Sequence, residues 1–486
     1  MENNFENLRI SQNTKNILQS NGFHIMTEIQ SKSIPILLSK KDLIAQSSTG
    51  TGKTLSFVIP IVDALSDNKF IDSVIISPTR ELATQTFNVF KMFTDNVSCC
   101  IGGLKEDKNL ENNDKIDNIN NQYEFNIDCS IIVGTPGKLQ TIIKQNVKKF
   151  SKVKFLILDE ADRLLDMGFK NIILGINKNF PSSKNTALFS ATIDQSILAL
   201  SKLSLRNPVT VKCESIMPEG LKIKYLVLKP FRKLGAMLSL LKKYKNIIVF
   251  FSTCAEVKYY TELFKILQER EITYMHGKMK QSERFLTLSK IGHDSILFCT
   301  DLAARGLDFE AVDLVIHFSV PVEPMNILHR SGRSARNGKQ GESIILLMEN
   351  EDKYISYLKV KHIEAKKYTD EIETISYSQI NNIITKEIKE YALKAFISHI
   401  RAYKEHVLSI LLSLKEINYD SLVALHFLEK IPGMDEIRGY NFKRFVKPPR
   451  ELLSKEERIK KYKQIAKNRE KKKLKHKKIN KKLKEK

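Results

Sequence analysis

The stretch Ala45-Gln-Ser-Ser-Thr-Gly-Thr-Gly-Lys53-Thr54 decides the fold of the first half of this chain. It follows the short apolar run Asp42–Ala45 and precedes Leu55–Ile59, which has the composition of a buried helix. A strand, a glycine-containing turn and a helix N-terminus in this order form a site for an anion, because unpaired backbone N–H groups point out of the helix. The stretch therefore predicts a phosphate-binding loop of the P-loop kind.

Side chains within this loop suit a nucleotide. Gly50 and Gly52 allow backbone N–H groups to approach phosphate oxygens, Lys53 supplies a charge for the β- and γ-phosphates, and the Thr54 hydroxyl suits Mg²⁺. The usual pattern has Gly where this chain has Ser47, so the alternative is a chance polar loop with a surface lysine. The predicted nucleotide-binding residues of the loop are Ser48, Thr49, Gly50, Thr51, Gly52, Lys53 and Thr54.

Two acids follow a second buried strand about a hundred residues later. Phe155–Leu158 is a continuous apolar run, as expected of a parallel strand covered on both faces. Asp159 and Glu160 come directly after it, at the strand end where open α/β sheets bind ligands. We expect Asp159 to hold Mg²⁺ and Glu160 to orient or deprotonate an attacking water. The alternative is a solvated helix start.

Composition limits the class of protein. The chain has 486 residues, enough for two or three domains, and 42% of them are hydrophobic. No apolar run approaches the roughly 20 residues of a membrane span, and we expect no membrane partner and no signal peptide. The six cysteines include no C-x-x-C pair, so we expect neither zinc nor disulfides, and a reducing compartment fits.

Positive charge is concentrated at the C-terminus. The net charge is +24, and residues 441–486 contain 21 Lys or Arg against 5 Asp or Glu. Such a tail attracts polyanions, although a solvated Lys-rich helix is the alternative. Lys471–Lys478 also has the composition of a nuclear address.

Apolar runs of strand length recur in both halves, with helical stretches between them. They are Val74–Ser77, Ser130–Val133, Phe155–Leu158 and Thr186–Phe189, then Asn246–Phe251, Ile272–Met275, Ser295–Cys299 and Asp313–His317. This alternation predicts two parallel, doubly wound sheets, with a linker within Pro208–Lys222. The predicted segments are a first domain at 1–212, a linker at 213–222, a second domain at 223–365, an extension at 366–440 and a tail at 441–486.

The second half lacks a phosphate-binding loop but carries clustered cations. In the run His329-Arg-Ser-Gly-Arg333-Ser-Ala-Arg336, two arginines lie three residues apart next to glycine. Arg333 and Arg336 can point in one direction and stabilise the charge that develops on a γ-phosphate. The alternative is a basic surface helix.

Residues 5–365 resemble the DEAD-box ATP-dependent RNA helicases, with the motifs in that family's order. The resemblance implies an α/β fold with two RecA-like parallel-sheet domains in tandem, followed by a small α-helical extension and a basic tail. It implies ATP and Mg²⁺ as cofactors and RNA as a partner. Phe5 and Gln30 match the segment that reads adenine, although Glu28 replaces its usual Pro. Gly306 and Asp308 match the nucleotide ribose site, and His329 falls in the arginine motif.

The family resemblance also implies an RNA path. Ser190 and Thr192 match the motif that couples hydrolysis to strand separation. Lys138 replaces a common Arg and cannot make the bidentate contact of a guanidinium. The implied RNA contacts are Pro78, Thr79, Arg80, Gly103, Thr135, Pro136, Gly137 and Lys138, then Ser252, Thr253, His276, Gly277, Gln281, Arg284 and Thr300.

The chain beyond residue 386 predicts a helical cap on the second domain. Apolar residues over 386–414 recur at steps of three and four, which indicates one helix face. A further helix is expected from Asp420 and Ser421 to about Glu429.

Residues 395–438 resemble the C-terminal extension of DEAD-box helicases that act in large ribosomal subunit assembly. The resemblance implies pre-rRNA in pre-60S particles, ribosome-assembly proteins as partners, a location in the nucleus and nucleolus, and a monomer outside the particle. The alternatives are a DEAD-box helicase acting on mRNA or in translation and a non-catalytic RNA-binding scaffold.

Overall fold

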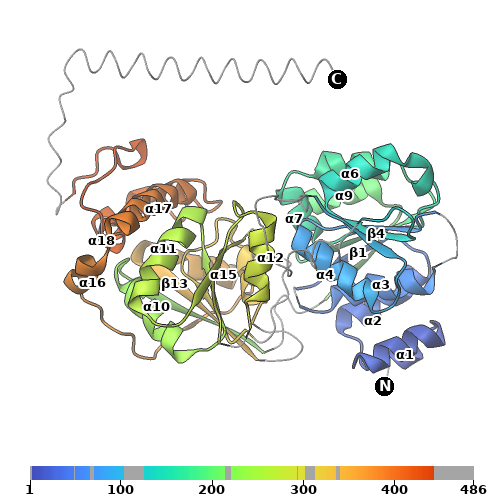
Figure 1. Cartoon of the computed structure of the whole chain (residues 1–486), viewed down its shortest axis with the longest axis horizontal. Helices are drawn as coiled ribbons and strands as arrows, with labels where there is room; N and C mark the ends of the chain where they lie inside the picture. The colour runs from blue at the N-terminus through green and yellow to red at the C-terminus, as the bar shows by residue number, and fades with distance from the viewer. Residues whose placement is uncertain are drawn as a thin grey trace, which may run out of the picture. The chain divides into compact units, whose positions relative to one another are not determined.

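The computed structural model describes residues 3–48, 50–65, 70–102, 125–213, 220–292, 294–301, 312–334 and 340–442. The chain divides into two compact units, Met1–Phe427 and Leu428–Lys486. Within the described part of the first unit, two parallel sheets of seven strands each are followed by a helical extension (Figure 1).

The first sheet has the strand order β3-β4-β2-β5-β6-β1-β7. Its strands are β1 (Leu43–Gln46), β2 (Ser73–Ile76), β3 (Val97–Cys100), β4 (Ile131–Gly134), β5 (Phe155–Leu158), β6 (Asn185–Ser190) and β7 (Val209–Lys212). Every pairing is parallel. The strand before the predicted loop and the strand before the acids therefore end at the same edge of one sheet.

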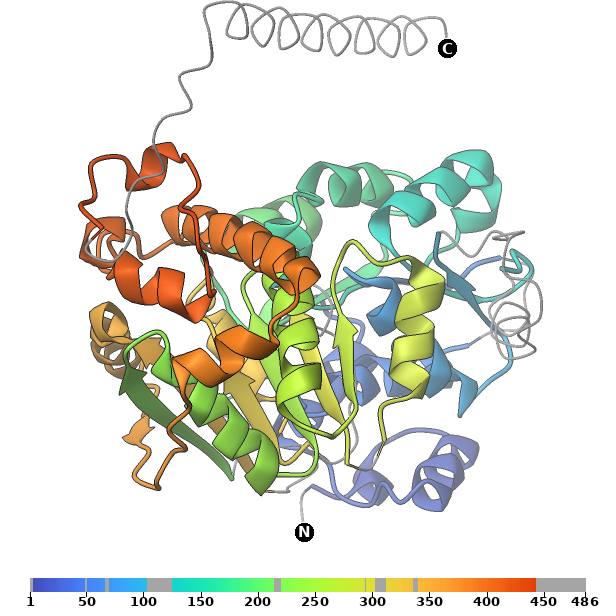
Figure 2. The same ribbon diagram turned by 60° about the vertical axis from the view of Figure 1, so that its left-hand side comes forward.

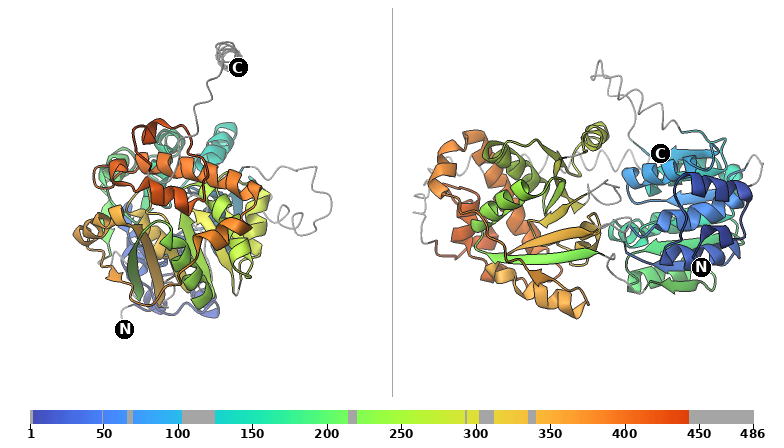
Figure 3. Two further views of the ribbon diagram at one scale, coloured as in Figure 1. Left: turned by 90° about the vertical axis from the view of Figure 1, so that its left-hand side faces the viewer. Right: turned by 90° about the horizontal axis from the view of Figure 1, so that it is seen from below.

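Helices cover both faces of this sheet because alternate strand residues point to opposite sides. The helices of this half are α1 (Gln12–Ser20), α2 (Glu28–Leu38), α3 (Lys53–Asp63), α4 (Arg80–Lys91), α6 (Pro136–Gln145), α7 (Ala161–Asp166), α8 (Lys170–Asn177) and α9 (Gln195–Ser204). Ile75 and Ile157 pack with α2, α3 and α4, whereas Val74 and Leu156 pack with α6 to α9. Figure 3 shows these layers from two further directions.

The second sheet has the order β10-β11-β9-β12-β13-β8-β14 and is also parallel. Its strands are β8 (Leu221–Leu228), β9 (Ile247–Phe251), β10 (Ile272–Met275), β11 (Ile296–Thr300), β12 (Leu314–His317), β13 (Gly341–Met348) and β14 (Lys366–Lys367). Its helices are α10 (Arg232–Lys243), α11 (Cys254–Leu267), α12 (Gln281–Ser289), α14 (Asn326–Ser331) and α15 (Lys353–Val360).

The predicted parallel α/β fold is confirmed, and every predicted strand is present with small shifts at its ends. The strands that sequence reasoning missed are β3, β7, β8, β13 and β14. β8 has the alternating pattern Leu-Lys-Ile-Lys and is only partly buried, so it lacks the continuous apolar run used to recognise the others.

The structure differs from the predicted linker at both ends. Val209–Lys212 is β7, which pairs with β1, and Leu221 and Lys222 already pair with β13. β7 is a short, partly exposed edge strand, so its sequence looks like a connecting segment. β8 has eight residues and lies between β13 and β14, but its alternating Leu-Lys-Ile-Lys start hides it.

The extension consists of α16 (Tyr377–Ile383), α17 (Lys386–Lys404) and α18 (Tyr419–Leu425). The single helix face predicted over 386–414 is wrong beyond Lys404. The backbone N–H of Val407 donates to the carbonyl of Val322 at 3.2 Å, which takes the chain away from helical geometry. Val407 and Ile410 are exposed in consequence. The later helix is shorter than predicted and is capped by Asn418.

The expected packing of the extension on the second sheet's helices is confirmed. Ser398 Oγ lies 2.8 Å from Thr253 Oγ1, and His399 Nδ1 lies 2.8 Å from Glu256 Oε1. Tyr259 donates from its hydroxyl to the Leu425 carbonyl at 3.3 Å. Figure 2 shows α17, in orange, running beside α11, in light green. These polar contacts join α17 and α18 to α11.

His426 makes the stability of this junction depend on pH. Burial, with a smaller contribution from His399, lowers the pKa of His426 to about 4, and the Leu422 carbonyl and Glu256 oppose the shift. Because the folded pKa lies below the ordinary value, the stabilisation is complete above pH 6.5 and is lost as the pH falls towards 4. We expect about 3 kcal/mol of unfolding free energy to be lost over this range through His426.

Urea unfolding at several pH values checks this expectation. His426→Gln should reduce the pH dependence between 6.5 and 4, whereas the exposed control His24→Gln should leave it unchanged. Equal pH dependence in the wild type and in His426→Gln would show that His426 is not responsible.

No helix among the described residues is long and apolar enough to cross a membrane. In the second unit the structure describes residues 428–442, which contain the short 3-10 helix η5 (Asp435–Ile437). The tail predicted at 441–486 lies outside the described residues from 443 onward.

Candidate nucleotide and RNA sites

The loop between β1 and α3 has the geometry that phosphate binding needs. Gly50 and Gly52 have φ of 79° and 87°, in the left-handed region that favours glycine. Gly52 is the N-cap of α3, so Lys53 is the first helical residue. Lys53 is buried, and its Nζ donates to the Ser47 carbonyl at 3.0 Å. The ammonium group is thus held inside the loop, next to the free N–H groups of the helix.

Ser47 fits where the usual pattern has glycine. Its hydroxyl lies 2.9 Å from Thr51 Oγ1, which also donates to the Ser48 carbonyl at 2.9 Å. The Ser48 hydroxyl is buried and has no hydrogen-bond partner among the described residues. Thr54 is half-buried on the first turn of α3, and Thr49 lies outside the described residues. Side-chain hydrogen bonds therefore stabilise the loop despite the missing glycine.

Gln30 holds the loop from the outside. Its Nε2 donates to the Gly52 carbonyl at 3.0 Å, and its Oε1 accepts from the Thr27 N–H at 2.8 Å. A Cβ atom at Gly52 would lie 2.4 Å from Gln30 Nε2, so the close approach requires glycine. Phe5 is buried in a cluster that includes Leu55 of α3. Sequence reasoning assigned Gln30 to adenine and missed this support of the loop.

The acids lie where the first sheet ends. Asp159 and Glu160 are both buried, and the Glu160 N–H donates to Asp159 Oδ1 at 3.0 Å. Burial, with a smaller contribution from Glu160, raises the pKa of Asp159 to about 7, and Lys53 opposes the shift. Glu160 has φ of 45°, an uncommon conformation for a residue with a side chain, and such conformations concentrate at functional sites.

These residues fit Mg²⁺. Lys53 compensates the charge of the two buried carboxylates only in part, and a divalent cation would supply the rest. Glu160 Oε2 is buried without a hydrogen-bond partner among the described residues, so it can accept a hydrogen bond from water. The described part of the chain has no cluster of three His, Cys, Asp or Glu that could hold a metal. That is compatible with Mg²⁺, which usually binds one or two carboxylates plus phosphates and water.

Asp162 contacts Thr192, one of the two residues predicted to couple hydrolysis to strand separation. Its Oδ2 accepts from the backbone N–H of Ala191 at 3.1 Å and from the Thr192 N–H and hydroxyl at 3.3 Å. His329 Nε2 lies 3.8 Å from the same oxygen. Burial raises the pKa of Asp162, but His329, Lys53 and the Ser190 hydroxyl together lower it below its usual value. One ionised carboxylate therefore contacts β6, the following turn and α14.

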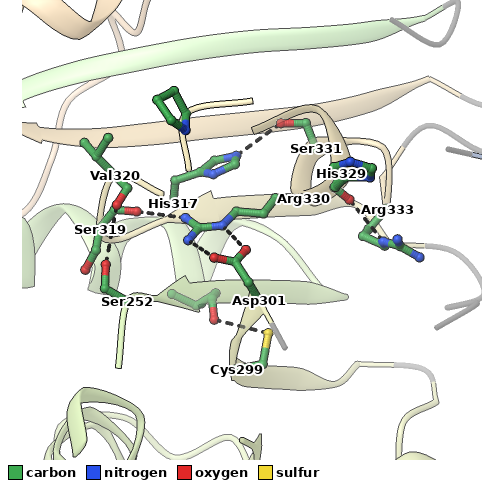
Figure 4. A network of polar contacts seen from close by, with 12 residues as sticks. Ser252, Cys299, Asp301, His317, Ser319, Val320, His329, Arg330, Ser331 and Arg333 are labelled. Atoms are coloured by element: carbon green, nitrogen blue, oxygen red, sulfur yellow. Dashed lines mark hydrogen bonds and ion pairs between the residues drawn. The ribbon is translucent and has the colours of Figure 1, made fainter. Parts of the chain in front are cut away.

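Arg330 is a residue that sequence reasoning left without a role. It is buried, and it forms a bidentate pair with Asp301, with N–O distances of 2.6 and 2.8 Å (Figure 4). Its Nη1 donates to the Ser319 carbonyl at 2.8 Å, and the guanidinium lies 5.1 Å from the centre of the Phe250 ring. No local pattern marks this pair, because its members lie 29 residues apart.

Of the two predicted arginines, the structure describes Arg333 and not Arg336. Arg333 is buried, and its Nε donates to the His329 carbonyl at 3.1 Å, so the two predicted residues of this motif are held together. Arg336 lies outside the described residues, as do Gly306 and Asp308.

The predicted RNA contacts gather at helix N-termini. Thr79 caps α4, Thr135 precedes Pro136 at the start of α6, and Thr253 caps α11. Helix N-termini present free N–H groups and favour phosphate. The other described members of the set are Pro78, Arg80, Gly137, Lys138, Ser252, His276, Gly277, Arg284 and Thr300.

Three of the predicted RNA contacts differ from the rest of the set. Gly103 lies outside the described residues, and so does the side chain of Gln281. Arg284 pairs with Glu81 of α4, with its Nη2 3.0 Å from Glu81 Oε1. In this structure the Arg284 guanidinium therefore contacts the carboxylate of Glu81, the residue directly after Arg80.

Family models match most of these elements. The DEAD/DEAH box helicase model covers residues 27–200, and the helicase conserved C-terminal domain model covers residues 230–338. The chain belongs to the DEAD-box ATP-dependent RNA helicase family. A third model, the C-terminal extension of ATP-dependent rRNA helicases like SPB4, matches residues 385–434. The predicted resemblance to the helicases of large-subunit assembly is confirmed at the level of family.

Relatives match over nearly the whole chain. ATP-dependent rRNA helicase SPB4 of Encephalitozoon cuniculi is 41% identical, covering 92% of this chain and 95% of the relative. ATP-dependent rRNA helicase spb4 of Schizosaccharomyces pombe is 33% identical, covering 89% and 76%. The solved structure of Mss116p bound to single-stranded RNA and AMP-PNP is 25% identical, with a TM-score of 0.76 and coverage of 90% and 94%. This DEAD-box helicase therefore binds ATP and RNA and is an enzyme.

Replacing Lys53 with Ala is expected to weaken ATP binding. A hydrogen bond to a charged group contributes about 1.5–3 kcal/mol, so Kd should rise roughly 10- to 150-fold. Isothermal titration with ATP and Mg²⁺ measures the change. Lys41→Ala removes an exposed lysine just before β1 and should have no effect. An unchanged affinity in Lys53→Ala would contradict the assignment of this loop.

Proposed function

We propose that this helicase uses ATP hydrolysis to separate short duplexes of ribosomal RNA during assembly of the large ribosomal subunit. The observation that carries the proposal is the extension. Residues 385–434 match the SPB4-like C-terminal model, and the relative that is 41% identical is named an rRNA helicase. The same match weighs against a helicase acting on mRNA or in translation, because it lies outside the two helicase domains that all DEAD-box proteins share.

The geometry supports specific roles in hydrolysis. Lys53 holds the β- and γ-phosphates at the start of α3, and Phe5 and Gln30 contact the adenine side of the nucleotide. Thr54 and Asp159 would hold Mg²⁺, which would supply positive charge beside the phosphates. The buried Glu160 carboxylate orients the attacking water and accepts its proton. Arg333 and Arg336 stabilise the negative charge that develops on the transferred phosphoryl group.

A non-catalytic scaffold is disfavoured by the same set of residues. A protein that only binds RNA has no need for a buried lysine inside a glycine loop. It also has no need for two buried acids at the same edge of the sheet. Burying such charges carries a free-energy cost, and a catalytic role gives a reason for it.

Coupling between hydrolysis and RNA is proposed to pass through Asp162. Its carboxylate contacts the turn that contains Ser190 and Thr192 and lies 3.8 Å from His329. A change at the acids would thus alter the position of β6 and α14. The RNA strand lies over the N-termini of α4, α6 and α11, where phosphates are bound without reading of bases.

The wider biology follows from the same proposal. The partners are pre-rRNA in pre-60S particles and ribosome-assembly proteins, the location is the nucleus and nucleolus, and the protein is a monomer outside the particle. ATP binding is assigned to residues 1–212, the second helicase domain to 223–365, the extension to 366–440 and the basic tail to 441–486.

Crosslinking in cells tests the RNA target. Glu160→Gln should trap the helicase on its substrate, and sequencing of crosslinked RNA should give sites concentrated in one region of large-subunit precursor rRNA. Crosslinks spread over mRNA without an rRNA focus would overturn the biological assignment and leave the helicase chemistry intact.

Deleting residues 441–486 is expected to lower RNA affinity. The segment carries a net charge of +16, and each phosphate of single-stranded RNA that it no longer neutralises reduces the slope of log K against log salt by about 0.7. ATPase activity without RNA should not change. Filter binding at several salt concentrations checks this, and an unchanged slope would make the tail a targeting or solubility segment.

A further inference from the structure

A groove of about 740 Å³ lies between the second sheet's RNA motifs and the extension. One wall is formed at the ends of β9 and β11 and the start of α11, and the other wall is α17. Ser252, Thr253, Gly277 and Thr300 line the first wall, and Lys394 and Arg401 of α17 line the second.

The first wall has the chemistry of a phosphate site. Thr253 is the N-cap of the 14-residue helix α11, so free N–H groups point towards the groove. The hydroxyl of Thr300 is buried and has no hydrogen-bond partner among the described residues. An unsatisfied buried hydroxyl beside a helix N-terminus indicates that a polar ligand completes the site. Asp301 is the one acid of this wall, and Arg330 neutralises it.

The second wall is a single face of α17. Lys394, Ser398, Arg401 and Glu405 recur at steps of three and four, and this face is distinct from the buried one. Lys394 and Arg401 are exposed and lie two helical turns apart, about 10.5 Å along the axis. Two cations at this spacing can follow an extended polyanion.

Hydrogen bonds fix the distance between the two walls. Thr253 Oγ1 lies 2.8 Å from Ser398 Oγ, and both residues line the groove. Next to this pair, His399 Nδ1 of α17 lies 2.8 Å from Glu256 Oε1 of α11. Glu256 is buried, and His399 lowers the pKa of Glu256 despite the opposing effect of burial. Because Ser398 on the groove face and His399 on the buried face both bond to the start of α11, the groove face of α17 is held opposite the first wall.

We propose that α17 extends the RNA site, with Lys394 and Arg401 binding phosphates of a single RNA strand held on the other wall by Ser252, Thr253, Gly277 and Thr300. The inference rests on the proposed RNA contacts of those four residues and adds new contacts outside the helicase domains. Small polar residues, N–H groups and the three cations Lys278, Lys394 and Arg401 match a phosphate backbone and offer no base-specific contacts. Of the two acids that line the groove, Asp301 is paired with Arg330, and Glu405 lies at the C-terminal end of α17. The strand must pass between two walls, so a duplex is disfavoured.

The test uses the full chain and single-stranded oligouridylate. Lys394→Ala with Arg401→Ala should weaken binding in the presence of a non-hydrolysable ATP analogue and lower the salt slope by about 1.4, the value for two phosphates that are no longer neutralised. Lys386→Ala with Lys415→Ala removes the same charge from exposed sites of the extension outside the groove and should leave both quantities near the wild-type values. Lys394→Arg with Arg401→Lys should also retain the slope.

Three outcomes are distinguishable. A slope that falls only in the Lys394 and Arg401 double variant supports the inference. Equal slopes in that variant and in the Lys386 and Lys415 control, with RNA-stimulated ATPase intact, overturn the inference and leave the proposed function standing. Absence of RNA binding by the wild type would instead contradict the proposed RNA contacts themselves.

Discussion

Replacing Glu160 with Gln is expected to reduce kcat of RNA-stimulated ATP hydrolysis by about 10²- to 10⁴-fold, the contribution of a positioned general base. The amide cannot accept the proton of water but has nearly the same shape, so ATP and RNA binding should persist. Glu160 is buried and has one carboxylate oxygen without a hydrogen-bond partner among the described residues. That oxygen is the one available to the attacking water.

A steady-state phosphate-release assay measures kcat, and fluorescence anisotropy measures RNA affinity. Asp166→Asn makes the same carboxylate-to-amide change on an exposed residue of α7 and should leave kcat unchanged. Turnover by Glu160→Gln at the wild-type rate would mean that another residue handles the water.

Replacing Arg330 with Leu is expected to lower the free energy of unfolding by about 3 kcal/mol, the lower end of the usual cost of removing one partner from a buried ion pair, because the Asp301 side chain is 23% exposed. Arg330 is 1% exposed and satisfies Asp301 and the Ser319 carbonyl together. Leucine keeps the apolar contact with Phe250 but leaves a carboxylate and a carbonyl without their donors. The loss of unfolding free energy should therefore come mainly from the lost ion pair and hydrogen bond, and little from lost apolar packing.

Urea unfolding followed by circular dichroism gives the midpoint for each variant. Arg232→Leu removes an arginine on the first turn of α10 and should shift the midpoint little. Arg330→Leu with Asp301→Leu should recover part of the stability, because no unpaired charge remains. If Arg330→Leu unfolds at the wild-type midpoint, the pair contributes nothing to the second domain.

Much of the nucleotide site could be predicted because it is local. The loop from Ser47 to Thr54 joins a strand directly to a helix, and Asp159 and Glu160 directly follow a strand. In both cases a short stretch of sequence specifies the backbone path and the functional side chains together. β5, a continuous apolar run buried on both faces, was recognised, whereas β8, which exposes one face, was missed. Burial alone does not explain the difference, because β3 and β13 are almost wholly buried and were missed as well.

In the helical extension, apolar spacing predicted the end of a helix incorrectly. Apolar residues continue beyond Lys404 at helical spacing, but Val407 and Ile410 are exposed because the backbone turns to pair with Val322. Spacing alone cannot reveal such a turn, since the competing hydrogen bond comes from a residue far away in the sequence.

The sequence by itself determined the family, the phosphate-binding loop, the acids and the order of the RNA motifs. The loop and the acids are contiguous runs whose chemistry can be read locally, and the family follows from the order of such runs along the chain. The tertiary structure alone decided the support of Gly52 by Gln30, the contact of Asp162 with Thr192, the pairing of Arg330 with Asp301, and the groove closed by Thr253 and Ser398. These partners are separated by 22, 30, 29 and 145 residues. The physical reason is that hydrogen bonds and ion pairs act over a few ångströms, and the parallel order of the strands brings such distant residues within that range.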